Sequence, residues 1–115
     1  MSPKNNPLKL NKLQLRTLTL AQVMARDPGM ARPDETTGEV ALLQLPHGHG
    51  DHLHVGEFTV SARDASGLSN PAVWTALARK GLSHSNNPGA VVTITAAGMA
   101  YDTGLGHHFM APSDH

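Results

Sequence analysis

Apolar residues recur through residues 11–26 in a pattern that predicts a helix covered on two sides. Asn11 suits the N-cap, and the Pro-Gly pair at 28–29 marks the end of the segment. One apolar face of this helix comprises Leu13, Leu20, Ala21 and Met24. Leu15 and Leu18 lie almost opposite. Because a surface helix needs only one apolar face, the second face predicts a homodimer whose interface includes Leu15 and Leu18.

Short apolar runs after this helix predict strands. "EVALLQLP" (39–46) ends at a proline, and "HLHVG" (52–56) alternates in the manner of a strand. The glycine-rich residues between them predict a hairpin that joins these two segments, with its tip near "HGHGD" (47–51). "AVVTIT" (90–95) predicts a further strand. Residues 59–66 fit either a helix or a strand that pairs with 39–46, because short amphipathic runs are ambiguous.

The second predicted helix, over residues 70–80, carries a signal at each end. Asn70 suits the N-cap, and Pro71 suits the first helical position. Arg79 and Lys80 favour the C-terminal end of the helix dipole, and Gly81 suits the position just beyond it. A short helix is also expected after an N-cap at residue 95. These elements predict an α+β domain over residues 10–105, with a flexible arm at 1–9 and a tail at 106–115.

Composition narrows the classes of function that the chain can have. It has 115 residues, enough for one domain with a core, and no cysteine, which excludes thiolate chemistry and disulfides. Nine basic residues balance nine acidic ones, so the whole chain lacks the positive charge typical of nucleic-acid binders. No apolar run approaches the length of a membrane span, and the N-terminus lacks a secretory signal pattern. We therefore expect a cytoplasmic protein of bacterial type that has no membrane partner.

Half of the chain's eight histidines lie in "HGHGDHLH" (47–54). On a strand, His52 and His54 point to the same face, and the glycines allow the preceding residues to turn towards them. Imidazole nitrogens with a carboxylate suit zinc, nickel, iron(II) or copper(II). The predicted metal ligands are His47, His49, Asp51, His52 and His54, completed by His107 and His108. The alternative hypotheses are a solvated polar turn and a pH-sensitive patch.

The same residues match the H-x-H-x-D-H signature of the metallo-β-lactamase superfamily. That match covers six residues, and those enzymes require a two-sheet scaffold much larger than this chain together with further ligands. We interpret the match as accidental, and keep a small metal-dependent hydrolase, or another histidine-site metalloenzyme, as an alternative function.

A second resemblance covers residues 59–101. "TVSARDASGLSNPAVWTALARKGL" resembles a helix-turn-helix, and "VVTITAAGMAY" resembles the wing and strand exit of regulators of the multiple-antibiotic-resistance type. The resemblance implies a winged helix in which residues 70–80 form the DNA-recognition helix. The DNA-contacting residues that it implies are Asn70, Trp74, Thr75, Arg79 and Lys80. Phosphate contacts need basic side chains, and this helix carries them only near its C-terminal end.

These features together predict a small regulatory or interaction module. The leading hypothesis is a metal-responsive, dimeric DNA-binding regulator, in which metal bound by the histidine stretch rigidifies the hairpin and biases the position of the 70–80 helix. The alternatives are the metal-dependent hydrolase and a protein-interaction dimer module without metal.

Overall fold

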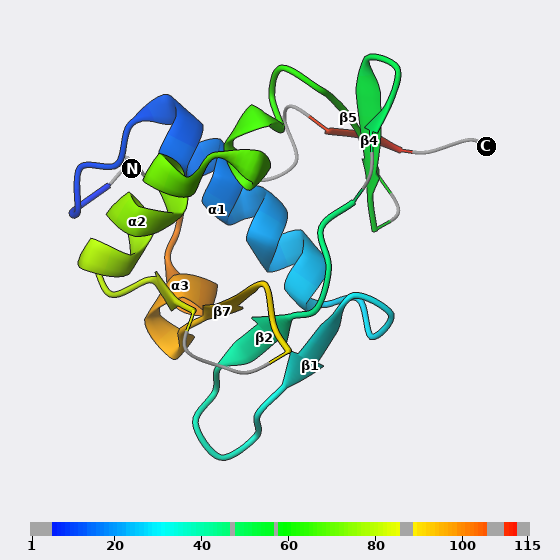
Figure 1. Cartoon of the computed structure of the whole chain (residues 1–115). Helices are drawn as coiled ribbons and strands as arrows, with labels where there is room; N and C mark the ends of the chain where they lie inside the picture. The colour runs from blue at the N-terminus through cyan, green and yellow to red at the C-terminus, as the bar shows by residue number, and fades with distance from the viewer. Residues whose placement is uncertain (1–5, 47, 57, 86–88, 106–109, 113–115) are drawn as a thin grey trace.

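A computed structural model describes residues 6–46, 48–56, 58–85, 89–105 and 110–112 of the chain. It confirms an α+β domain, in which the N-terminal helix lies beside two antiparallel sheets (Figure 1). The elements in chain order are α1 (Lys12–Ala25), β1 (Ala31–Pro33), β2 (Val40–Leu42), β3 (Gly48–His49), β4 (His52–Val55), β5 (Phe58–Ser61), the 3₁₀ helix η1 (Ser66–Ser69), α2 (Pro71–Arg79), β6 (Ser83–His84), β7 (Val92–Ile94), α3 (Ala96–Ala100) and β8 (Met110–Pro112).

The predicted boundaries of α1 and α2 and the predicted start of α3 are confirmed. Asn11 caps α1 through a capping box with Gln14, in which each side chain accepts a backbone N–H from the other residue. The Asn70 side chain caps α2, Pro71 occupies its first turn, and Gly81 beyond it has a φ of 78°. Thr95 caps α3 by accepting the Gly98 N–H at 3.0 Å.

The first sheet has the strand order β1-β2-β7-β6, and every neighbouring pair is antiparallel. Val40 lies opposite Ile94 and Leu42 opposite Val92, and all four side chains are buried. They join residues from the C-terminal half of α1, including Leu20 and Met24, in the larger of two apolar clusters. This sheet therefore closes the main core against α1.

The second sheet has the order β3-β4-β5-β8 and contains the histidine hairpin. Residues 59–61 belong to a strand, so the helical alternative for residues 59–66 is wrong; turns and η1 follow instead. The expected pairing of residues 39–46 with the next two strands is also wrong. β2 pairs with β1 and β7, while β4 pairs with β3 and β5. The chain thus leaves the first sheet before it forms the hairpin.

Parts of both terminal segments, which were expected to lie outside the domain, contribute to the folded structure. β8, in the segment expected to be a tail, pairs with β5, with Met110 opposite Val60. In the segment expected to be a flexible arm, the Leu8 N–H donates to the Tyr101 hydroxyl at 3.2 Å, and that hydroxyl donates to Asn6 Oδ1 at 2.7 Å. Residues 6–9 are therefore anchored to the chain that follows α3.

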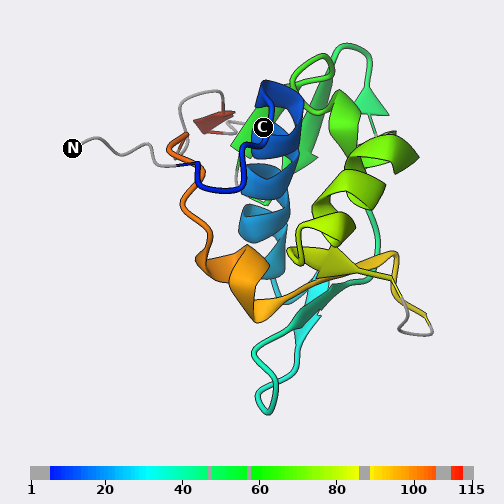
Figure 2. The ribbon, with the colours of Figure 1, turned by 90° about the vertical axis from the view of Figure 1, so that its left-hand side faces the viewer.

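The second apolar face of α1 is covered by α2 of the same chain, and Figure 2 shows the two helices side by side. Leu18 is 0% exposed and packs in the smaller cluster with Val73 and Leu77. No partner subunit is therefore needed to cover Leu18, contrary to the prediction, because η1 and α2 fold back onto α1. Leu15 is half-buried against the same cluster. A homodimer stays a prediction that no longer rests on these leucines.

Candidate functional site

The histidine hairpin has its tip at Gly50 and Asp51, as predicted. Gly50 has a φ of 70°, a conformation that favours glycine, and His49 lies opposite His52 across the turn. The rings of His52 and His54 lie edge to face, with centroids 5.1 Å apart. Asp51 Oδ1 lies 3.5 Å from His52 Nδ1. The strand thus places two imidazoles on one face and a carboxylate beside the first of them.

The remaining predicted metal ligands are not placed by the structure. His47, His107 and His108 lie outside the described residues, as does the side chain of His49. Within the described ranges, no group of three or more His, Cys, Asp or Glu side chains is arranged to hold a metal ion. The described part of the predicted site therefore consists of Asp51, His52 and His54.

On α2, two of the predicted DNA contacts already have internal partners. Asn70 Oδ1 accepts the Ala72 N–H at 3.0 Å, and the indole N–H of Trp74 donates to the Leu68 carbonyl at 2.9 Å. Thr75, Arg79 and Lys80 are exposed. Of the five predicted contacts, these three have side chains turned to solvent.

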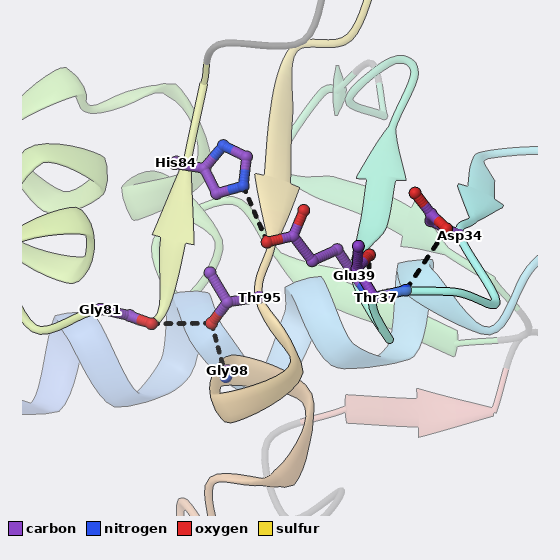
Figure 3. A network of polar contacts seen from close by, with 7 residues as sticks. All are labelled: Asp34, Thr37, Glu39, Gly81, His84, Thr95 and Gly98. Atoms are coloured by element: carbon purple, nitrogen blue, oxygen red, sulfur yellow. Dashed lines mark hydrogen bonds and ion pairs between the residues drawn. The ribbon is translucent and has the colours of Figure 1, made fainter.

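A polar network that the sequence analysis did not predict crosses the first sheet (Figure 3). His84 Nε2 lies 3.1 Å from Glu39 Oε2, although the residues are 45 positions apart in sequence. Next to this pair, the Thr95 hydroxyl donates to the Gly81 carbonyl at 2.7 Å. No local pattern indicates the His84–Glu39 pair, because it depends on β7 lying between β2 and β6.

A groove of about 470 Å³ runs between α2 and the β6 and β7 strands. Its lining is mainly apolar and includes Leu45, Leu68, Pro71, Trp74 and Val92. Ser83 and His84 are among its polar residues. The sequence pattern indicated α2 and the strand segment that contains β7, but it indicated neither β6 nor this groove, because the walls of the groove come from segments that meet only in the folded chain.

Comparisons with protein-family models, with curated proteins and with solved structures found no match to this chain. Among the described residues, no helix has both the length and the apolar character needed to cross a membrane.

Proposed function

We propose that the chain is a winged-helix-like DNA-binding module. The observation that carries this proposal is the arrangement of α1, β2, η1, α2, β6 and β7 in chain order, with β7 paired between β2 and β6. A winged helix requires a recognition helix followed by an antiparallel strand pair, and α2, β6 and β7 supply that arrangement. The short η1 stands in the place of the first helix of the helix-turn-helix, and the histidine sheet is inserted before it.

In this proposal, α2 contacts DNA through the side chains that it exposes. Arg79 and Lys80 attract phosphates, and Thr75, one turn before Arg79, faces the base edges or backbone. Asn70 and Trp74 position the helix, since Asn70 Oδ1 accepts the Ala72 N–H and the Trp74 indole N–H donates to the Leu68 carbonyl. With two basic side chains on the helix, affinity is expected to be modest and strongly dependent on salt.

The DNA-binding proposal predicts a specific loss in the Arg79→Ala/Lys80→Ala variant. Removing two phosphate-seeking charges is expected to weaken binding by about tenfold and to lower the slope of log affinity against log salt by about 2. The measurement is fluorescence anisotropy of a labelled random-sequence duplex over a salt series. Arg26→Ala/Arg32→Ala is the matched control, because it removes two exposed arginines, one at the C-cap of α1 and one in β1.

Two results would contradict the DNA-binding proposal. If the wild-type protein shows no salt-dependent binding to duplex DNA, the fold serves instead as a protein-interaction module. If both double variants lose affinity equally, the binding reflects overall charge and not α2.

A second candidate function, metal binding by the hairpin, is favoured by the 5.1 Å separation of the His52 and His54 rings. Small side-chain rotations bring two such imidazoles to one ion, and Asp51 supplies either a ligand or a partner that orients an imidazole. Zinc, nickel, iron(II) and copper(II) suit this donor set. We further propose that such a metal regulates DNA binding, because β5 leads through residues 62–65 directly into η1 and α2.

The metal hypothesis predicts that His52→Ala/His54→Ala removes bound metal. Elemental analysis of untagged protein, purified without chelator, is expected to show near-stoichiometric metal in the wild type and none in the variant. His84→Ala is the control, since it removes an imidazole from the other sheet and should leave the metal content unchanged. Equal metal in wild type and double variant, or none in either, would overturn the hypothesis. A bound metal with an open coordination position would favour the hydrolase alternative.

A further inference from the structure

A cleft of about 510 Å³, a volume in the range of ligand pockets, lies on the face of the first sheet that is turned away from α1. Val40 and Leu42 bury their side chains in the core beside α1, so Ala41 between them points to the opposite face. The strand register places Arg32 and Thr93 on either side of Ala41 on that face. The short side chain of Ala41, between longer neighbours, leaves the hollow that forms the cleft.

The lining of this cleft carries charges of both signs. Its described residues include one basic side chain, Arg32, and three acidic ones, Asp34, Glu35 and Glu39. Arg32 comes from β1, whereas Glu39 lies at the start of β2, beyond the turn that contains Asp34 and Glu35. Binding sites and their ligands carry complementary charges. A lining with both signs and an excess of carboxylates therefore suits a ligand that carries one anionic group and a larger positive charge.

The internal contacts of these four side chains show which of them are held and which are available. Glu39 reaches across β7 to His84 at 3.1 Å, with α1 behind the sheet (Figure 3), and Asp34 accepts backbone N–H groups of its own turn. The side chains of Arg32 and Glu35 take part in no ion pair or hydrogen bond within the described part of the chain. The guanidinium and this carboxylate line the same cleft without pairing, so each is available to a group of opposite charge on a ligand.

We infer that the cleft binds a small zwitterion with net positive charge, of which a basic α-amino acid is the simplest example. The carboxylate of the ligand accepts two parallel N–H bonds from Arg32, the geometry that a guanidinium offers to a carboxylate. The α-ammonium group lies at Glu39, the cationic side chain reaches Glu35, and the aliphatic part of the ligand lies over Ala41. This inference does not depend on DNA binding or on a metal at the hairpin.

Three matched probes test the inference: L-arginine, agmatine, which is arginine without its carboxylate, and L-citrulline, in which an uncharged urea group replaces the guanidinium. The backbone amides of Ala41 and Thr93 report binding in a ¹H–¹⁵N spectrum, because both residues line the cleft. At low ionic strength we expect L-arginine to shift these signals saturably and to bind about fivefold more tightly than either analogue, the contribution of one solvent-accessible ion pair. Equal affinity for L-arginine and either analogue, or no saturable shift with L-arginine, would overturn the inference.

Two variants assign the charges of the ligand to the ends of the cleft. In Arg32→Gln, the affinity ratio of L-arginine to agmatine is expected to fall towards one, whereas Glu35→Gln should lower the ratio of L-arginine to L-citrulline instead. Arg63→Gln is the control, since it removes an exposed arginine that does not line the cleft, and it should keep both ratios. Arg32 and Glu35 are exposed, so both variants should melt at the wild-type temperature. Wild-type ratios in Arg32→Gln would contradict the proposed role of its guanidinium.

Discussion

Replacing Gly98 with alanine is expected to lower the free energy of unfolding by about 3 kcal/mol, the upper end of the range for overpacked cores. Gly98 lies in α3 directly against the chain that enters β6. A Cβ at this position would overlap the Leu82 carbonyl oxygen and lie 2.8 Å from Cγ2 of Ile94. Ile94 is fully buried, and the Leu82 carbonyl accepts the Thr95 N–H at 3.1 Å. Neither neighbour can move without disturbing the first sheet.

The position of α3 is also held from the other side. Gln22 Nε2, on α1, donates to the Gly98 carbonyl at 2.8 Å and to the Tyr101 carbonyl at 2.9 Å. A shift of α3 that made room for a methyl group would therefore lengthen these bonds as well. No small movement of α3 relieves this strain. The expected loss of unfolding free energy is therefore large for the addition of one carbon atom.

Urea denaturation, monitored by circular dichroism, measures the effect of Gly98→Ala on stability. If the wild type and the variant have the same denaturant slope, the difference between their midpoints reports the change in unfolding free energy. Gly29→Ala is the matched control. An added Cβ there would meet only the end of the Asp27 side chain, at 3.3 Å, so the stability should change by less than about 0.5 kcal/mol. Wild-type stability in Gly98→Ala would show that α3 does not pack closely against Leu82.

The Leu18→Ala variant is expected to lose about 3 kcal/mol of unfolding free energy, as is typical of a fully buried leucine whose removal leaves a cavity. Leu18 is 0% exposed and contacts the cluster that contains Val73, Leu77 and Leu82. The variant therefore loosens the contact between α1 and α2. If α2 contacts DNA, the same variant should also weaken DNA binding at temperatures where it is still folded.

The dependence on protein concentration separates the two explanations for Leu18. Burial within one chain predicts the same loss at every protein concentration, whereas burial at a subunit interface predicts a loss that changes with concentration. Leu15→Ala is the control on the same helix face; because Leu15 is only half-buried, its loss should be about 1 kcal/mol. If the loss caused by Leu18→Ala changes with protein concentration, that result would support a dimer whose interface includes Leu18.

The candidate sites differ in how far the sequence predicted them. His52 and His54 were expected on one face of a strand, and the structure places their rings there, because the alternation of side chains is a local property of a strand. The cleft residues Arg32 and Glu39 were not predicted as a site. Their position around Ala41 and Thr93 arises from the pairing of β2 with β1 and β7, which no short motif records.

The sequence by itself determined the boundaries of α1 and α2, the start of α3, and the segments that contain β2, β4 and β7. Asn11, Asn70, Pro71 and Thr95 act on backbone groups only a few residues away, so their effect can be recognised without a tertiary structure. Glycine at the hairpin tip and after α2 acts through its own backbone angle and is equally local.

Only the tertiary structure decided which strands pair and what covers α1. The pairing of β2 with β7 joins residues about fifty positions apart, and it competes with the sequence-adjacent pairing that local patterns favour. Apolar periodicity shows that a helix face is buried, but it carries no information on whether the cover comes from the same chain or from a partner. Here, η1 and α2 return to α1 and bury Leu18 within the chain, because this packing completes the smaller apolar cluster.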